Sequence, residues 1–173
     1  MLKKTATFAV ILWFALATLA IGGEVSIGRA RIVAENWLTQ YVRTYGGWAG
    51  SVSPKIDEEE LMIFKDQVVG YNFMVSPKGH IIVPSRDELP PVKLYSETTT
   101  VSMQEKSRFV GEWIREELFK LSEALEEHAV EMADMASRPT SNGSLWSLFE
   151  SDHLTTAKAY ETATEGFDFL NLG

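Results

Sequence analysis

Two stretches of the chain repeat apolar residues with the period of an α-helix. From residue 28 to residue 44 the apolar positions lie three or four residues apart, which predicts an amphipathic helix, and Gly46-Gly47 would end it. Residues 104–137 show the same spacing over about three heptads, which predicts one long helix with an apolar seam. The positions of this heptad seam are Ile114, Leu118, Leu121, Leu125, His128, Met132 and Met135.

The segment between these helices has the alternation of β-strands. Every second residue from Val69 to Val75 is apolar, Ser76–Gly79 has the composition of a turn, and Ile81–Val83 is apolar again. This pattern predicts a β-hairpin over residues 67–85. Before it, residues 48–58 are predicted to form a loop that leads into a short apolar strand.

Shorter patterns follow the hairpin and the long helix. Residues 92–95 indicate one more short strand, and residues 137–143 have the composition of a linker. Short helices are expected over residues 145–149 and 155–163. The apolar tail, residues 166–173, favours either a truncated end or a strand that pairs elsewhere.

These elements predict an α+β fold, with a small antiparallel sheet, an N-terminal helix packed on it, a long helix and short C-terminal helices. The expected domain organisation is a signal peptide over residues 1–23, an α+β domain over 24–103, a long amphipathic helix over 104–137, and a linker with a short helical tail over 138–173. A helix of that length would extend about 50 Å. We therefore expect part of it to lie outside the sheet.

The N-terminus has the features of a targeting signal. Lys3 and Lys4 precede an uncharged stretch from Thr5 to Gly23, and Ala20-Ile21-Gly22 supplies the small residues that signal peptidase requires. This pattern predicts export to the periplasm or the extracellular space. The 19 uncharged residues are also long enough to span a bilayer, so an uncleaved anchor is the alternative.

Charge and cysteine content narrow the classes of partner and chemistry. The net charge is −8, and removal of the predicted signal leaves 14 basic and 24 acidic residues, a net charge of −10. Such a surface disfavours nucleic acids and, after signal cleavage, anionic membranes, whereas it suits a basic partner. Because the chain has no cysteine, thiol nucleophiles, disulfides and thiolate metal sites are excluded.

The sequence offers no credible active site. Its histidines are His80, His128 and His153, and it has no Gly-x-Ser-x-Gly motif to supply an activated serine. We expect His80 to be solvated beside the hairpin turn and His128 to set the register of the heptad seam. Asp152 and His153 are adjacent, and adjacent residues on a helix do not face each other. We therefore expect no enzyme activity.

Metal and cofactor motifs are missing as well. The chain has no His-x-x-x-His, and the acidic run Asp57–Glu60 lacks the alternating ligands and the glycine of a calcium loop, so a solvated acidic loop is the favoured interpretation. Gly46–Gly50 lacks the Lys-Ser/Thr of a phosphate-binding loop. No metal and no cofactor are expected.

A proline-rich extended segment is the candidate binding site. Rigid extended segments lose little conformational entropy on docking into a peptide-shaped cleft. The alternative is that the segment is only an edge strand and its approach. The residues expected to contact a partner are Asp87, Pro90, Pro91, Val92, Lys93, Leu94, Tyr95 and Ser96.

The same region carries a family resemblance. Residues 69–85 (Val-Gly-Tyr-Asn-Phe-Met-Val-Ser-Pro-Lys-Gly-His-Ile-Ile-Val-Pro-Ser) resemble the Tyr-Asn-Phe motif, glycine-tipped hairpin and serine of streptopain propeptides and the related streptopain inhibitors. That family continues with an acidic residue, a Pro-Val pair and an aromatic-Ser pair, as Asp87, Pro91-Val92 and Tyr95-Ser96 do here. The resemblance covers roughly residues 28–100. It includes a leading helix similar to the one that contains Ala30, Ala34, Trp37 and Leu38.

The resemblance implies a small, secreted bacterial domain without chemistry of its own. Members of the family sit against a papain-like cysteine peptidase, keep it inactive and assist its folding, or inhibit it as free proteins. It therefore implies occlusion of a streptopain-type peptidase, in cis or in trans. The Trp-x-Gln stretch and the catalytic Cys of the family's peptidase do not occur here, and residues 101–173 depart from the shorter propeptides.

Two alternatives to this interpretation remain open. The chain would be a structural or interaction module if the heptad seam from Ile114 to Met135 mediated self-association. It would otherwise be the truncated N-terminal piece of a peptidase precursor.

Overall fold

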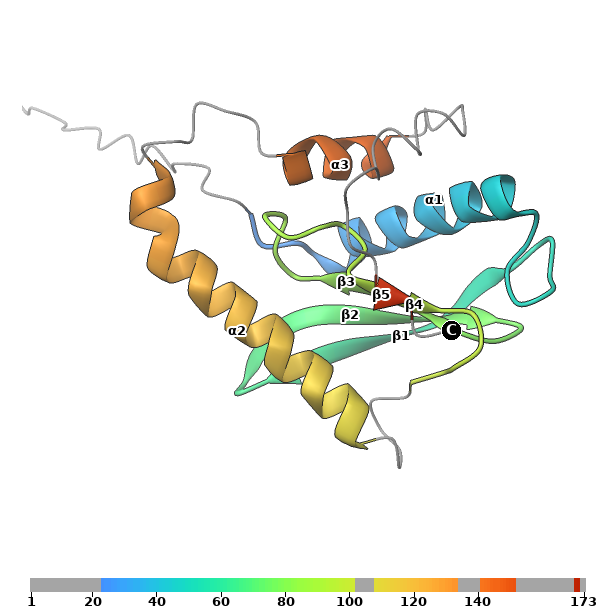
Figure 1. The fold of residues 1–173 in the computed structure, drawn as a ribbon, viewed down its shortest axis with the longest axis horizontal. Coiled ribbons are helices and arrows are strands. Elements are labelled where there is room, and N and C mark those ends of the chain that lie inside the picture. Colours follow the sequence, from blue (N-terminus) through green and yellow to red (C-terminus); the bar gives the residue numbers. More distant parts are fainter. Residues whose placement is uncertain (1–22, 102–107, 134–140, 152–169, 172–173) are drawn as a thin grey trace, which may run out of the picture.

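Four antiparallel strands form the centre of the fold, and helices lie on both faces of the sheet (Figure 1). The computed structural model describes residues 23–101, 108–133, 141–151 and 170–171. The predicted α+β class is confirmed. The elements in chain order are α1 (Ile27–Tyr45), β1 (Lys55–Phe64), β2 (Gln67–Ser76), β3 (His80–Pro84), β4 (Leu94–Ser96), α2 (Arg108–Ala133), α3 (Ser141–Glu150) and β5 (Leu170–Asn171).

Helix α1 matches its prediction because both of its ends are encoded locally. Ser26 is the N-cap, and its hydroxyl accepts a hydrogen bond from the Arg29 amide at 3.3 Å. Gly46 ends the helix with a φ of 84°, and its amide donates to the Val42 carbonyl at 2.8 Å. The helix residues that are buried are Ala30, Val33, Ala34, Trp37, Leu38, Gln40 and Tyr41.

Strands β2 and β3 form the predicted hairpin. Tyr71 lies opposite Val83, and the Val75 amide donates to the Gly79 carbonyl at 3.0 Å. The Ser76–Pro77 peptide bond in the connection is cis. Gly79 has a φ of 108°, and a Cβ at this position would overlap the Ser96 carbonyl oxygen. Only glycine therefore fits at the tip of the hairpin.

Strand β1 begins earlier than predicted, at Lys55, so the prediction of a loop over residues 48–58 is wrong for its last four residues. The acidic run Asp57–Glu60 lies within this strand, at the outer edge of the sheet. Edge strands tolerate charged residues because one side of the strand faces water. Register shifts interrupt its pairing with β2 between Ile56 and Glu58 and between Met62 and Ile63.

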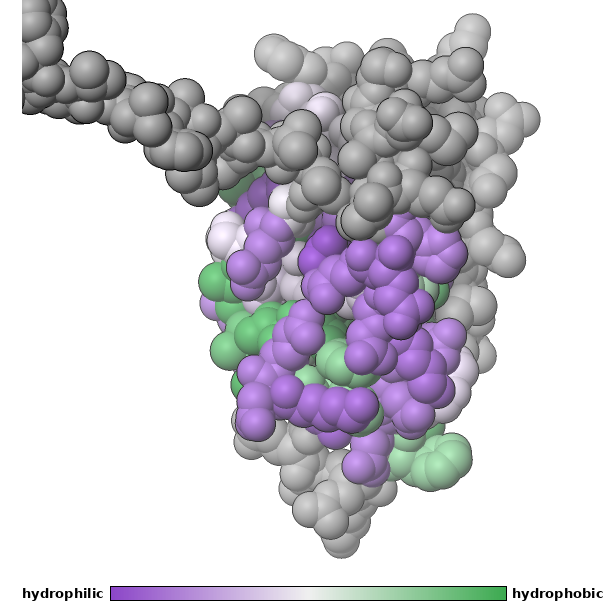
Figure 2. Space-filling view, turned by 90° about the vertical axis from the view of Figure 1, so that its left-hand side faces the viewer, coloured by the Kyte–Doolittle hydropathy of each residue, from purple (hydrophilic) through white to green (hydrophobic). Residues whose placement is uncertain are grey.

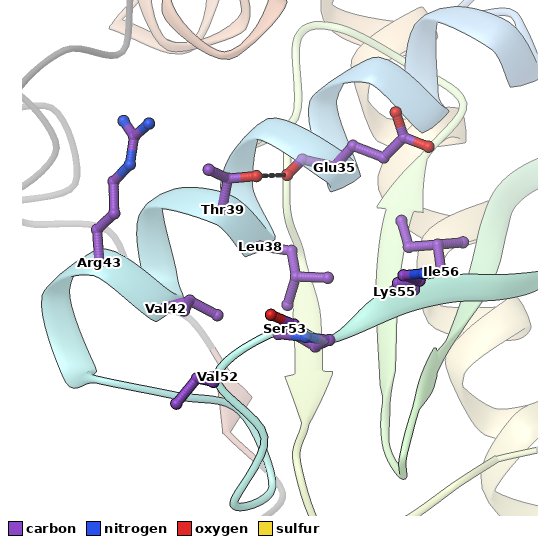
Figure 3. Close-up of a pocket in the computed structure, with 10 residues that line it drawn as sticks. Glu35, Leu38, Thr39, Val42, Arg43, Val52, Ser53, Lys55 and Ile56 are labelled. Carbon is purple, nitrogen blue, oxygen red and sulfur yellow. Dashed lines mark hydrogen bonds between the residues drawn. The ribbon is translucent and has the colours of Figure 1, made fainter.

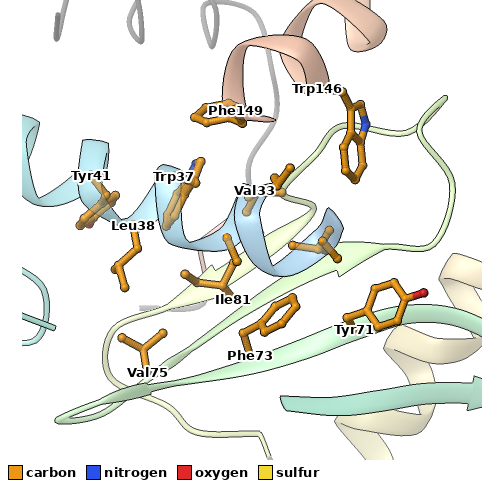
Figure 4. Close-up of a cluster of buried hydrophobic side chains, with 14 of the residues drawn as sticks. Val33, Trp37, Leu38, Tyr41, Tyr71, Phe73, Val75, Ile81, Trp146 and Phe149 are labelled. Atoms are coloured by element: carbon orange, nitrogen blue, oxygen red, sulfur yellow. The ribbon is translucent and has the colours of Figure 1, made fainter. Parts of the chain in front are cut away.

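The sheet separates two hydrophobic clusters, which we call the α1-side core and the α2-side core. Alternation along β3 places Ile81 and Val83 in the first and Ile82 in the second. Figure 4 shows the α1-side core, in which Trp37 and Phe73 lie between α1 and the sheet. The α2-side core comprises Met62, Val69, Ile82, Leu89, Leu94, Ile114, Leu118 and Phe119.

Helix α2 packs against the sheet with the first half of the heptad seam. Ile114 and Leu118 are buried there, and Leu121 and Leu125 pack against the same core while remaining partly exposed. A Cβ on Gly70 would lie 3.1 Å from a Leu118 methyl group, so the absence of a side chain on β2 allows the close approach. The seam positions Met132 and Met135 lie outside the residues whose side chains are described.

Helix α3 begins at Ser141, so the prediction of a linker over residues 137–143 is wrong for its last three residues. Its apolar residues Leu145, Trp146 and Phe149 are buried against α1 in the α1-side core. Burial of this face explains why the helix extends beyond its short sequence pattern, since tertiary packing stabilises short helices more than propensity does.

Near the end of the chain, β5 pairs in parallel with Leu94 and Tyr95 of β4. This pairing confirms the interpretation of part of the apolar tail as a strand that pairs elsewhere. The predicted signal peptide, apart from Gly23, and the predicted helix over residues 155–163 lie outside the described residues. Within the described ranges, no helix combines the length and apolarity needed to cross a membrane.

Candidate functional site

The predicted contact segment, residues 87–96, is anchored to the rest of the domain at its first residue. The Asp87 carboxylate accepts hydrogen bonds from the Gly23 amide at 2.6 Å and from the Arg29 guanidinium at 2.8 Å. Arg29 also pairs with Glu150 of α3 at 2.6 Å and stacks over the Trp146 ring at 5.0 Å. The start of the segment is therefore held by α1 and α3 together.

The main chain beside the prolines is held by α3. The Leu89 carbonyl accepts a hydrogen bond from the Trp146 indole at 2.8 Å, and the Glu88 carbonyl accepts one from the Asn142 amide at 2.5 Å. At the far end, the Lys93 amide donates to the Ile82 carbonyl at 2.9 Å. The segment is thus a fixed part of the fold, and its conformation is set by long-range contacts.

Most apolar side chains of this segment point into the protein. The exposed fraction is 1 % for Val92 and 2 % for Leu94, and both belong to the hydrophobic cores. The structure therefore brings the candidate residues together as a strand and its approach, which is the alternative interpretation of the pattern. Of the eight candidates, Pro91, Val92, Leu94 and Ser96 are buried, and Asp87, Pro90, Lys93 and Tyr95 are partly exposed.

Tyr95 belongs to an aromatic cluster between α1 and the sheet. Its ring centroid lies 4.8 Å from that of Trp37 and 5.5 Å from that of Tyr41. Beside this cluster, the Glu97 carboxylate accepts hydrogen bonds from the Tyr41 hydroxyl and from the Ala49 amide. Burial, together with the hydrogen bond to Glu97, raises the pKa of Tyr41 well above its ordinary value of 10.0. The cluster therefore fixes the beginning of the loop after β4.

The rest of that loop is held by polar side chains of the sheet. The Asn72 amide donates to the Val101 carbonyl at 2.7 Å, and the Ser96 hydroxyl accepts from the Thr99 amide at 3.1 Å. The His80 ring contacts the Thr99 carbonyl through Nδ1 at 2.6 Å. Above these contacts the side chains of Thr98, Thr99 and Thr100 are exposed. The loop therefore exposes its side chains, while its main chain is held by hydrogen bonds to buried side chains of the sheet.

His80 is fully buried, so the prediction of a solvated loop residue is wrong. It is the first residue of β3 and lies opposite Ser96 of β4, and the loop after β4 covers it. Burial lowers the pKa of His80 below its ordinary value of 6.5, against the effect of the hydrogen bond to Thr99. The imidazole is therefore neutral near pH 7, and its Nδ1–H donates to the carbonyl.

The described histidines do not form a catalytic arrangement. His80 bonds to main chain, and exposed His128 contacts the Ala124 carbonyl one turn earlier on α2, at 2.9 Å. His153 lies outside the described residues. In the part of the chain that the structure describes, no group of three or more His, Cys, Asp or Glu residues is placed to hold a metal ion.

A groove between α1 and the start of β1 is a feature that the sequence did not indicate. Leu38 and Val42 of α1, together with Val52 and Ile56, line a space of about 560 Å³. Figure 3 shows these side chains between the helix and the segment that leads into β1. Glu35, Arg43 and Lys55 supply charges around these apolar side chains. The pattern of apolar residues did not predict this groove, because one of its walls is formed by residues 52–56, which were predicted to be a loop.

Strand β1 continues from this groove as the outer strand of the sheet. Leu61 and Ile63 are 48 % and 49 % exposed, whereas Met62 between them is buried in the α2-side core. Alternation therefore places Leu61 and Ile63 on the α1 side, where α1 does not cover them. Val52, which is 76 % exposed, lies near the beginning of the strand.

Large apolar side chains are also exposed at the beginning of α2. Phe109 is 83 % exposed and Trp113 is 49 % exposed. They lie one turn apart, so they share one face of the helix. Figure 2 shows that hydrophilic residues cover most of one face of the molecule and that a smaller hydrophobic area extends to its left-hand edge.

Compared with protein-family models, with curated proteins and with solved structures, the chain gives no match. The features of the chain that bear on its function are the hairpin with its Tyr-Asn-Phe motif, the fixed segment that follows it, and the open edge of β1.

Proposed function

We propose that the chain is an exported, non-catalytic domain that binds a streptopain-type, papain-like cysteine peptidase and inhibits or chaperones it by covering its active-site cleft. The proposal combines the family resemblance of residues 69–85 with the way in which those residues organise the domain. It requires no cofactor and no metal. Inhibition would be steric, so the domain would not be consumed.

The observation that carries the proposal is the role of the Tyr-Asn-Phe motif at the centre of the sheet. The Tyr71 hydroxyl donates to the Val25 carbonyl at 2.5 Å and so holds the start of α1. Asn72 holds the loop after β4 through the Val101 carbonyl, and Phe73 is fully buried in the α1-side core. The Tyr-Asn-Phe residues that carry the family resemblance are thus the ones that connect α1, the sheet and the loop after β4 into one domain.

The segment after the hairpin supports occlusion by a preformed surface. Because residues 87–96 are already ordered by hydrogen bonds and burial, little conformational entropy would be lost when a partner docks there. The side chains it leaves partly exposed include Pro90 and Lys93. We propose that these two residues and the exposed loop over residues 98–100 contact the peptidase, with an interface of about 800 Å² on each partner.

The test is a titration of the purified chain against an activated streptopain-type peptidase, with hydrolysis of a peptide substrate as the readout. We expect dose-dependent inhibition, with the chain remaining intact. Lys93→Glu should weaken inhibition by about tenfold, since it reverses a charge at the contact surface. Lys120→Glu is the matched control, because Lys120 lies exposed on α2.

Two results would contradict the proposal. One is the absence of inhibition at about 10 μM by a chain that circular dichroism shows to be folded, since specific inhibitors of this interface size bind far more tightly. The other is an equal loss of inhibition in Lys93→Glu and Lys120→Glu, which would indicate a general effect of net charge.

A second function is favoured by the exposed aromatic residues of α2. Phe109 and Trp113 form an apolar surface on one face of the helix, which suits a protein–protein contact. We propose self-association through α2 as this alternative. Sedimentation velocity over a range of concentrations would test it, and Trp113→Glu should shift the chain to monomer. A monomer at all concentrations would exclude it.

A further inference from the structure

Strand β1 presents one open edge along ten residues, from Lys55 to Phe64. In the strand order β1-β2-β3-β4-β5 it has a neighbour on one side only. An outer strand carries main-chain amides and carbonyls that a further extended segment can pair with. Within the described ranges, no segment occupies this position.

The two faces of this edge differ in chemistry. On the α1 side, the strand presents exposed Leu61 and Ile63, and the apolar groove lies at its beginning. Glu59 lies on the same side between Leu61 and the groove, opposite Phe73, and its carboxylate pairs with Arg31 of α1 at 2.8 Å. On the α2 side lie Glu58 and Glu60, which pair in register with Met74 and Asn72 of β2. Asp57 is exposed at the register shift between Ile56 and Glu58. A strand added here would have one row of side chains beside Leu61, Ile63 and the Arg31–Glu59 pair, which is neutral overall. The other row would lie beside the carboxylates of Glu58 and Glu60.

A second copy of the chain does not suit this edge. Pairing two β1 strands would bring the acidic run Asp57–Glu60 of each copy close to that of the other, and like charges on neighbouring strands destabilise pairing. The chain's own segments outside the described ranges do not alternate basic and apolar residues. Residues 152–169 contain one lysine and four acidic residues, residues 102–107 one lysine and one glutamate, and residues 134–140 one arginine and one aspartate. Residues 1–22 carry their two basic residues side by side, at Lys3 and Lys4, and the rest of that segment is uncharged.

We infer that the outer edge of β1 binds an extended segment of a partner protein in which apolar and basic residues alternate, and that this segment adds to the sheet as a strand. Its apolar side chains would cover Leu61 and Ile63 and enter the groove beside Val42. Its basic side chains would lie along Glu58 and Glu60. This inference does not depend on the identity of the partner as a peptidase.

The probe is a fluorescently labelled peptide of about eight residues that alternates Val and Lys, a length typical of one strand. A second peptide has the same composition, with all Val residues before all Lys residues. A third alternates Val and Glu. Fluorescence anisotropy is recorded with the full chain. We expect the first peptide to bind, the second to bind at least about tenfold more weakly, and the third not to bind.

Charge-reversal variants locate the binding site. Asp57→Lys combined with Glu58→Lys should weaken binding of the first peptide by about tenfold or more. The matched control is Glu123→Lys combined with Glu127→Lys, which makes the same change of charge at exposed positions of α2. Leu61→Thr tests the apolar row, since threonine keeps the strand propensity while removing much of the apolar surface. Hydrogen exchange of the β1 amides should slow when the first peptide binds.

Three results would overturn the inference. They are equal binding of the two Val-Lys peptides, equal weakening by the two charge-reversal pairs, and no binding at about 1 mM, where even weak specific complexes form. The peptidase titration is a separate experiment. A chain that inhibits the peptidase without binding the alternating peptide would overturn only the role of the β1 edge.

Discussion

The side-chain amide of Asn72 donates to the Val101 carbonyl at 2.7 Å and so connects the central strand β2 to the end of the loop that follows β4. Asn72 is fully buried and Val101 is 2 % exposed. His80 and Ser96 hold the same loop at Thr99. The exposed loop is therefore positioned by buried polar side chains, whose loss is more costly than that of exposed ones.

Replacement of Asn72 by Ala should lower the free energy of unfolding by about 1–3 kcal/mol, because the Val101 carbonyl loses its buried donor. Urea denaturation followed by circular dichroism measures this change. The control is Thr39→Ala, since the exposed Thr39 hydroxyl donates to the Glu35 carbonyl within α1. The control should change stability by less than about 0.5 kcal/mol. Equal effects of the two substitutions would contradict the role assigned to Asn72.

Gly79→Ala should destabilise the protein by several kcal/mol, more than Gly46→Ala does. Both glycines have positive φ, 108° and 84° respectively, so alanine is strained at either position. At Gly79 the added methyl group would also overlap the Ser96 carbonyl, whereas the space around Gly46 is open. Gly46→Ala should therefore cost only about 1 kcal/mol in thermal or urea unfolding. A smaller loss of stability in Gly79→Ala than in Gly46→Ala would show that the Ser96 carbonyl does not pack against the hairpin tip.

Stability should fall as the pH drops below 6.5, the ordinary pKa of histidine, because His80 is buried and its folded pKa is lowered. In this window the unfolded chain binds a proton that the folded chain does not, so the free energy of unfolding decreases by up to about 1.4 kcal/mol per pH unit. The decrease continues until the pH reaches the folded pKa. Urea denaturation between pH 7.5 and pH 5.5 measures it, above the range in which ordinary carboxylates titrate.

A histidine variant identifies the source of this pH dependence. His80→Gln should remove most of the slope between pH 7.5 and pH 5.5, because glutamine does not titrate. Thr39→Gln, at an exposed position of α1, is the control and should leave the slope unchanged, because neither residue titrates. A slope that persists in His80→Gln would assign the effect to another group.

Phe149→Ala should cost about 3–5 kcal/mol, because the Phe149 side chain is fully buried between α3 and α1. Phe109→Ala is the matched control, since Phe109 is 83 % exposed, and it should change stability by less than about 0.5 kcal/mol. Calorimetry should show a single cooperative transition that moves to lower temperature in Phe149→Ala. If the main unfolding transition of Phe149→Ala stayed at its original temperature and a second transition appeared, α3 would unfold independently of the sheet.

Helix α1 and the hairpin β2–β3 were predictable because their signals are local. The apolar period and Gly46 lie within or next to the helix that they define, and the structure adds Ser26 as its N-cap. The hairpin depends on alternation along two adjacent strands and on a connection that requires glycine at residue 79. Both elements would be recognised in any fold that contained them.

The candidate site was predictable only in part. The pattern from residue 87 to residue 96 predicted an extended segment, whereas residues 87–88 form a turn and only Leu94–Ser96 form a strand. Nor does the pattern reveal which of these side chains face the solvent. Val92 and Leu94 are buried because α1, α2 and the neighbouring strands cover them, and those contacts join residues far apart in the sequence. The groove beside Val42 was missed for the same reason, since its two walls have no shared sequence pattern.

By itself the sequence determined the α+β class, helix α1 and the hairpin, because periodic apolar positions and turn residues act over a few neighbouring residues. The tertiary structure alone decided that His80 is buried, that the acidic run Asp57–Glu60 forms an outer strand, and that the heptad seam begins by packing on the chain's own sheet. These outcomes depend on which surfaces meet after folding. Burial and edge position are properties of the assembled layers, and no local pattern specifies them.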